Sequence, residues 1–107
     1  MTTLYIRPQT LTEIDSAIAS LEAQIAALTA QGLERGSVQK VSGSSRHRLV
    51  WWDADRQKVV ASPVLDPAVV PQMRAAHQRW RDCQNLRAAV ADLQSRRDRM
   101  AGVRTAA

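Results

Sequence analysis

Apolar side chains recur early in the chain at alternating steps of three and four, the heptad pattern of a helix that packs on a partner helix. They are Leu11, Ile14, Ile18, Leu21, Ile25 and Leu28. Thr10 and Glu13 form a capping box before this run. Gly32 follows it and suits the left-handed conformation that often ends a helix. The pattern predicts a first helix over residues 11–31.

A second, longer apolar face follows Asp66 and Pro67, which supply an N-cap and a proline at the first helical position. Pro71 lacks the N–H group for an intrahelical bond, so either one turn at 67–70 precedes a kink or the helix begins at Pro71. We place the regular helix from about Pro71. Its apolar face comprises Met73, Ala76, Trp80, Cys83, Leu86, Val90, Leu93 and Met100. Steps of three on both sides of Cys83 break the heptad register and argue against a long ideal coiled coil.

The segment between the helices has β-strand character. Residues 33–45 are rich in Gly and Ser and indicate a turn, a short strand and a loop. Residues 48–52 and 58–62 are rich in β-branched and aromatic side chains, and the polar connection 53–57 has hairpin length. Successive strand residues face opposite sides, so we expect one of Trp51 and Trp52 to pack and the other to be more exposed. The alternative, that both are core residues on the two faces of a ribbon held between helices or subunits, is favoured because the chain has no Phe.

The expected fold class is therefore mainly α, an antiparallel, coiled-coil-like helical hairpin that carries a β-ribbon between its helices and forms a dimer. We expect one domain over residues 1–107: an N-terminal arm (1–9), the first helix (10–32), a basic loop and β-hairpin (33–65), the second helix (66–101) and a frayed tail (102–107). The residues expected to pack the helices and the oligomer are Leu11, Ile14, Ile18, Leu21, Ile25, Leu28, Trp80, Leu86, Val90 and Leu93.

The charge is distributed unevenly along the chain. The formal net charge is +5, from 15 basic and 10 acidic residues. Through Glu34 there is one basic residue against four acidic ones, and beyond it 14 basic against 6 acidic. A basic surface attracts polyanions, which makes nucleic acid (DNA or RNA) the first expected partner. Thirteen of the basic residues are Arg, whose planar guanidinium group pairs well with phosphate. High genomic G+C content also enriches a protein in Arg and is an equal explanation of this excess.

The strongest candidate site is the basic central segment, where cationic side chains surround two tryptophans. Such a mixture suits phosphate contact combined with base stacking. The residues expected to bind nucleic acid are Arg35, Lys40, Arg46, His47, Arg48, Arg56, Lys58 and Trp52. For residues 46–48, a solvated turn or a contact with an acidic protein is an equal alternative. The arginines of the second helix are as well explained by solvation or by pairing with acidic residues.

Catalysis has little support in the sequence, and we expect a protein that is not an enzyme and has no cofactor, no metal and no small-molecule substrate. His47, His77 and Cys83 lack metal-binding spacing, and Cys83 lies in the apolar stripe. Asp53 and Asp55 lie on the predicted hairpin turn, where Asp caps backbone amides. The single cysteine fits a reducing compartment, and no stretch resembles a signal peptide or a membrane span. We expect a cytoplasmic protein.

Four features follow one another along the chain: Arg-Gly-Ser-Val at residues 35–38, Arg46-His47, the hairpin over residues 49–61 and a long helix with Trp80. This order resembles a family of short bacterial helix-hairpin-helix proteins of unknown function, which are often associated with mobile elements. The resemblance covers roughly residues 32–97 and implies the layout. The family typically carries cysteines and a His-Gly-Pro step before the hairpin. Here residues 42–48 contain no Cys and His47 is followed by Arg48, so no metal or redox role carries over.

Two functions remain open at this point. The first is a small basic nucleic-acid-binding accessory protein, dimeric, that contacts phosphates through its central loop, hairpin and helix arginines. The second is a helical protein-interaction module, such as an adaptor, subunit or inhibitor, that acts through its heptad face and hairpin.

Overall fold

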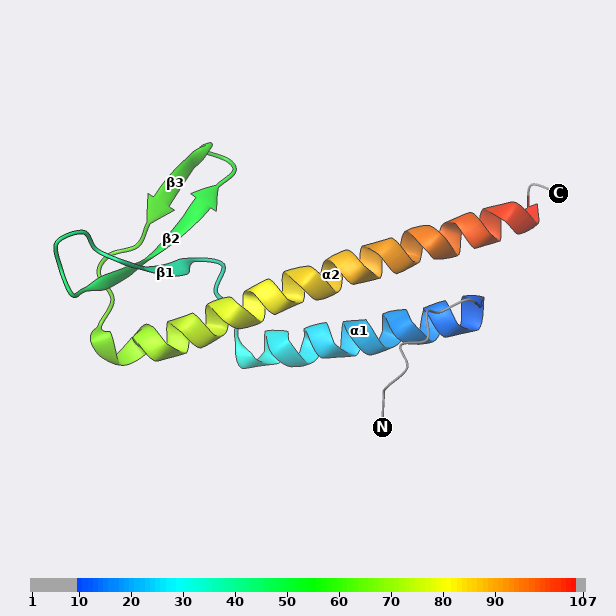
Figure 1. The fold of residues 1–107 in the computed structure, drawn as a ribbon, viewed down its shortest axis with the longest axis horizontal. Helices are drawn as coiled ribbons and strands as arrows, with labels where there is room; N and C mark the ends of the chain where they lie inside the picture. Colours follow the sequence, from blue (N-terminus) through cyan, green and yellow to red (C-terminus); the bar gives the residue numbers. More distant parts are fainter. Residues whose placement is uncertain (1–9, 106–107) are drawn as a thin grey trace. The chain divides into compact units, whose positions relative to one another are not determined.

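A computed structural model describes residues 10–105, with side chains for residues 10–102. It confirms the mainly α fold class, with two long antiparallel helices that flank a small sheet in the chain. The predicted arm over residues 1–9 lies outside the described residues. In chain order the elements are α1 (Leu11–Gln31), β1 (Ser37–Lys40), β2 (His47–Asp53), β3 (Lys58–Ala61), the 3-10 turn η1 (Pro67–Val69) and α2 (Val70–Thr105) (Figure 1).

The chain forms two compact units. Of the described residues, 10–27 and 84–105 make the first, which we call the two-helix unit. Residues Leu28–Cys83 make the second, the sheet unit, which holds the three strands, η1 and the adjoining ends of both helices. The prediction of a single domain stays a prediction.

Both ends of α1 form as the sequence predicts. The amide of Glu13 donates to the hydroxyl of Thr10 at 3.1 Å, and the first helical backbone bond runs from Ile14 N–H to the carbonyl of Thr10 at 2.9 Å. These bonds satisfy amides that a helix start otherwise leaves without partners. At the other end, Gly32 has φ +99°, a left-handed conformation that costs glycine nothing. The predicted boundaries of α1 are confirmed.

Helix α2 begins within one residue of the predicted start and differs from the prediction at its C-terminal end. Asp66 accepts a hydrogen bond from Ala68 N–H at 2.9 Å, and Pro67 occupies the first position of η1, as expected. The α-helix begins at Val70, which places Pro71 in the first turn, where its missing N–H group has no intrahelical partner to lose. The helix continues to Thr105, although a frayed tail was predicted from residue 102. Once a helix exists, each further residue adds a hydrogen bond at little cost, and no proline stops it.

Within the two-helix unit, α1 and α2 run side by side in opposite directions (Figure 1). Ile14 is fully buried, and Val90 and Leu93 of α2 are buried. Asp15 Oδ1 and Arg97 Nε form an ion pair at 2.6 Å at the exposed edge of this packing. The predicted apolar faces of both helices are thus the faces that pack.

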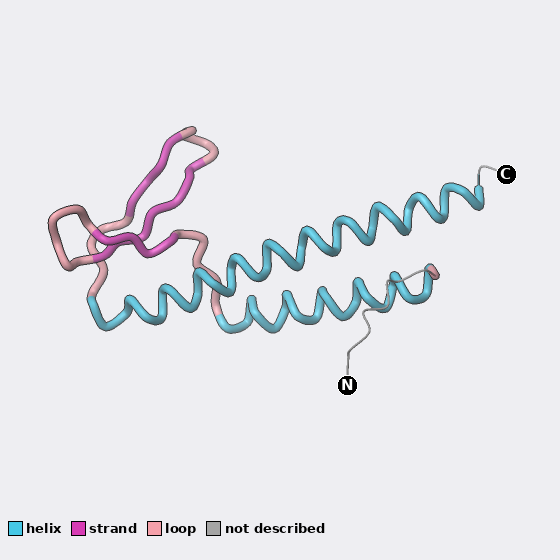
Figure 2. The backbone as a smooth tube through the Cα atoms, viewed as in Figure 1, coloured by secondary structure: helices cyan, strands magenta, loops and turns pink. Residues whose placement is uncertain are grey.

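The sheet contains three antiparallel strands in the order β1-β2-β3 (Figure 2). The predicted two-stranded ribbon is therefore incomplete, because the short strand expected in the Gly- and Ser-rich segment pairs with the free edge of β2. In the hairpin turn, Asp53 Oδ1 accepts from the amides of Asp55 and Arg56 at 3.0 and 3.2 Å. This confirms the expected capping role of an aspartate in the turn.

The segment after α1 fastens the sheet to the start of α2. The amide of Glu34 donates to the carbonyl of Ala76 at 3.2 Å, and His77 Nδ1 lies 3.1 Å from the carbonyl oxygen of Glu34. Gly36 is buried and its backbone approaches Leu49 closely, because a Cβ atom on Gly36 would lie 3.1 Å from Cβ of Leu49. Leu49, Ala76 and Cys83 are the buried apolar residues of this unit among those described.

Candidate functional site

The two faces of the sheet have different environments. Side chains alternate along a strand, so the strand register assigns each residue to one face. On one face, which we call the inner face, Leu49 is buried and Trp51 and Val60 are half-buried. The other face, which we call the open face, is exposed over most of its positions: Ser37 and Gln39 of β1, Arg48, Val50 and Trp52 of β2, and Val59 and Ala61 of β3.

Trp52 is the most prominent side chain of the open face. It is 58% exposed, and its cross-strand neighbour Val59 is 63% exposed. Within one chain Trp52 is not a core residue, so the interpretation that both hairpin tryptophans are core residues would require another subunit to cover Trp52. The expectation that Trp51 and Trp52 point to opposite sides is confirmed.

Arg48 lies on the same face and strand as Trp52. Trp52 follows Arg48 by four residue steps of extended chain, which corresponds to about 13 Å along β2. Arg48 is exposed, and its neighbour across β1 is Gln39. The open face thus presents an aromatic ring, a guanidinium group and an amide side chain on one surface.

The remaining residues of the predicted site do not join this surface. Three lie at inner-face positions: Lys40, His47 and Lys58. Arg46 lies in the loop before β2, and Arg56 is tied to Asp53 in the hairpin turn by a 3.6 Å ion pair. The prediction of one basic cluster around both tryptophans is therefore replaced by several separate positions, of which Arg48 and Trp52 share a face.

Arg35 has a packing role. Its guanidinium carbon lies 5.6 Å from the centre of the Trp51 ring, within the range of a cation–π contact. Gly36, next in the chain, approaches Cε3 of the same ring so closely that a Cβ atom would lie 3.4 Å from it. Arg35 and Gly36 therefore cover Trp51 on the inner face of the sheet, which leaves Trp52 as the ring open to a partner.

The arginines of α2 have several intramolecular partners. Arg79 donates from Nε to the carbonyl of Gly32 at 2.8 Å and from Nη2 to that of Gln31 at 3.2 Å. Arg97 pairs with Asp15, and Arg87 donates to Gln84 Oε1 at 3.2 Å. Sequence reasoning missed the role of Arg79, although a helix end followed by Gly leaves carbonyls that a distant cation can satisfy.

The residues predicted to pack the helices lie where the heptad pattern places them. Ile14, Val90 and Leu93 are buried, and the other seven keep part of their surface exposed: Leu11, Ile18, Leu21, Ile25, Leu28, Trp80 and Leu86. Trp80 also stacks on His77, with ring centres 5.7 Å apart and planes inclined by 18°. Each helix thus has one apolar face, and that face is partly covered.

Over the residues that the structure describes, no group of three or more His, Cys, Asp or Glu side chains could hold a metal ion. Cys83 is fully buried in the apolar stripe of α2, where a thiol behaves as a small hydrophobic group. In the described part of the chain, no helix is both long enough and apolar enough to cross a membrane.

Comparison of the chain with protein-family models, with curated proteins and with solved structures finds no match.

Proposed function

We propose that this protein binds single-stranded nucleic acid on the open face of its sheet, with Trp52 stacking on a base and Arg48 contacting a phosphate. The observation that carries the proposal is the 58% exposure of Trp52 on the same face as Arg48. Exposing most of a large aromatic side chain to water is unfavourable, and stacking on a base removes that surface from water.

A single strand fits this surface better than a duplex. Stacking on a protein ring requires a base that is not already stacked on both sides, as in single strands and loops. A short sheet with an exposed ring provides such a platform. The amide of Gln39 donates one N–H to Ser37 Oγ at 2.9 Å, and its oxygen and second N–H can form hydrogen bonds with a base edge or with the backbone of the strand.

Electrostatics supports the same choice of partner. The sheet unit carries nine basic against five acidic residues, so the unit that contains the open face has an excess of positive charge. For a single strand, the logarithm of the binding constant falls with the logarithm of salt concentration at a slope of about −0.7 per phosphate neutralised. Arg48 contributes one such contact in this proposal.

Fluorescence anisotropy of a labelled single-stranded oligonucleotide tests the proposal at two or more salt concentrations. We expect Trp52→Ala to weaken binding by about 1–3 kcal/mol, the contribution of one stacked base. We expect Arg48→Gln to reduce the salt slope by about 0.7. Val59→Ala is the matched control, because it removes exposed apolar surface beside Trp52 but no aromatic ring. Equal losses for Trp52→Ala and Val59→Ala, or no binding at low salt, would refute the proposal.

A second candidate function is a helical protein-interaction module, including a homodimer. It is favoured by the partly covered apolar face of α1, on which Ile14 alone of the six heptad residues is buried. Light scattering distinguishes the two candidates. If the helices form the interface, Ile18→Asp lowers the mass to that of one chain, whereas Ala19→Asp on the exposed side of α1 leaves it unchanged. A wild-type mass of one chain argues against this candidate.

A further inference from the structure

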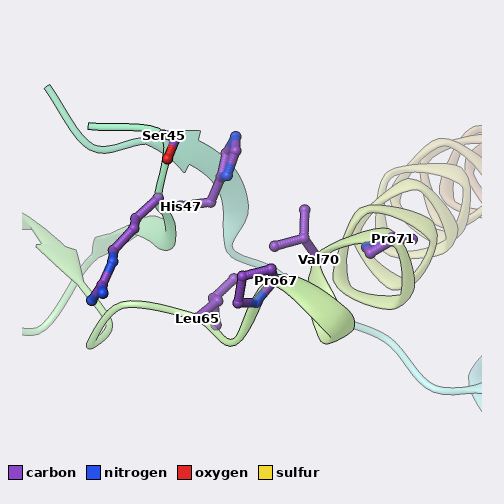
Figure 3. Close-up of a pocket in the computed structure, with 7 residues that line it drawn as sticks. Ser45, His47, Leu65, Pro67, Val70 and Pro71 are labelled. Atoms are coloured by element: carbon purple, nitrogen blue, oxygen red, sulfur yellow. The ribbon is translucent and has the colours of Figure 1, made fainter. Parts of the chain in front are cut away.

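A pocket of about 220 Å³ lies in the sheet unit, between the start of β2 with the loop before it and the segment from Leu65 through η1 to the first turn of α2 (Figure 3). One wall is apolar and consists of Leu65, Pro67, Val70 and Pro71. The opposite wall is polar and basic and consists of Ser45, Arg46 and His47. In Figure 3, Leu65, Pro67 and Val70 lie on one side, and Ser45 and His47 lie across from them.

Hydrogen bonds hold both walls in place. The amide of Leu65 donates to the carbonyl of His47 at 2.8 Å, which joins the two walls directly. The amide of Arg46 donates to Ser44 Oγ at 3.0 Å, and its carbonyl accepts from Val41 N–H at 2.8 Å. The backbone on the basic side is thus ordered, whereas the side chain of Arg46 is exposed at the rim. A preformed pocket costs little ordering entropy when a ligand enters.

The composition of the walls restricts the chemistry of the ligand. Aliphatic side chains and proline rings offer flat C–H surfaces for an uncharged ring, and hydroxyl, guanidinium and imidazole groups on the other side favour an anion or a hydrogen-bonding edge. The volume lies below the range of about 300–1,000 Å³ that is usual for pockets binding whole drug-sized ligands. One heterocycle with an adjacent anionic group satisfies both conditions.

We propose that this pocket binds one nucleobase against its apolar wall, with the adjacent phosphate held by Arg46. The inference rests on the proposed function, because Arg46 and His47 directly precede Arg48 in the chain and the pocket therefore lies at one end of the strand that carries the open face. A bound single strand would then have two contacts for its bases, the ring of Trp52 on the open face and the pocket beside His47, and to reach both it passes around the end of β2.

Titration of the ¹⁵N-labelled protein with adenosine or cytidine monophosphate tests the pocket directly, with inorganic phosphate as the second probe. We expect the amide signals of Arg46, His47 and Val70 to shift with the nucleotides and to shift much less with phosphate. Equal affinity for inorganic phosphate would overturn the proposal, because the apolar wall would then contribute nothing. Absence of shifts at these amides at millimolar nucleotide would also overturn it.

Two pairs of variants separate the pocket from general effects of charge and size. Val70→Trp fills the pocket, whereas Val64→Trp makes the same change at a residue outside its lining. Arg46→Gln removes a charge at the rim, whereas Arg81→Gln removes one at an exposed position of α2 outside the lining. We expect the pocket variants to weaken nucleotide binding by about tenfold, or 1.4 kcal/mol, and the controls to leave it unchanged. Equal effects within each pair would refute a role of the pocket.

The failures of the two proposals are distinguishable. If oligonucleotides bind and depend on Trp52 but the Val70→Trp and Arg46→Gln variants behave as their controls, the pocket inference is wrong and the function stands. If the wild-type protein binds no oligonucleotide, the function is wrong, and so is the inference that rests on it. If a short acidic peptide with aliphatic side chains shifts the pocket amides and nucleotides do not, the pocket serves a protein partner.

Discussion

Arg79 is expected to stabilise the fold by binding the end of α1, which lies 47–48 residues before it in the sequence. Its guanidinium donates to the carbonyls of Gln31 and Gly32, at 3.2 and 2.8 Å, at the point where α1 ends. The last carbonyls of a helix have no intrahelical donors, and the negative end of the helix dipole favours a cation there. Arg79 therefore joins the end of α1 to the body of α2 within the sheet unit.

The magnitude follows from these contacts. A hydrogen bond from a charged group contributes about 1.5–3 kcal/mol when it is shielded from water, and less when it is partly exposed, as here. We therefore expect Arg79→Ala to lower the free energy of unfolding by about 1.5 kcal/mol. Arg79→Lys keeps the charge near the helix end but loses the fork that reaches two carbonyls, so its loss should be about half as large.

Urea denaturation followed by circular dichroism measures these differences. Arg81→Ala is the matched control, because Arg81 is an exposed arginine on the same helix and such surface changes lie within about 0.5 kcal/mol. If Arg79→Ala and Arg81→Ala cost the same free energy, the two hydrogen bonds contribute nothing to stability and the reasoning is refuted.

Two further pairs of variants test the packing, each by the same unfolding measurement. Gly36→Ala places a Cβ atom 3.1 Å from Cβ of Leu49 and should cost about 1–3 kcal/mol, whereas Gly102→Ala in α2 meets no atom within 4 Å and should add about 0.5 kcal/mol of helix stability. If Gly36→Ala is neutral, the inner face is not closely packed. Ile14→Ala, at a fully buried position, should cost about 2–5 kcal/mol, and Ile18→Ala, at a half-buried one, clearly less. Equal costs would mean that the helices pack on a different face of α1.

The sequence predicts most of the fold because local signals mark the elements. Thr10, Gly32 and the Asp66-Pro67 pair define helix ends through their own side chains and backbone preferences, so no tertiary information is needed. The heptad steps of α1 likewise predict the packed face. For β1 the sequence predicts a short strand but not its place in the sheet. The pairing of β1 depends on the free edge of β2, which a local pattern does not show.

The candidate site was less predictable for a related reason. Composition identifies a basic segment with two tryptophans, but the alternation of a strand sends neighbouring residues to opposite faces. His47 and Arg48 are adjacent in sequence and lie on opposite sides of the sheet. Arg35 could not be recognised as a partner of Trp51 from sequence, because that contact depends on the close approach permitted by Gly36.

The most direct measurement of the central claim uses the three tryptophan indole N–H signals in a ¹H–¹⁵N spectrum. Trp52 lies on the open face, Trp51 lies on the inner face beside Arg35, and Trp80 lies on α2 against His77. On addition of a single-stranded oligonucleotide, we expect the signal of Trp52 to shift strongly and the other two to change little. A stationary Trp52 signal while the oligonucleotide binds would contradict the account, because the strand would then contact a different surface.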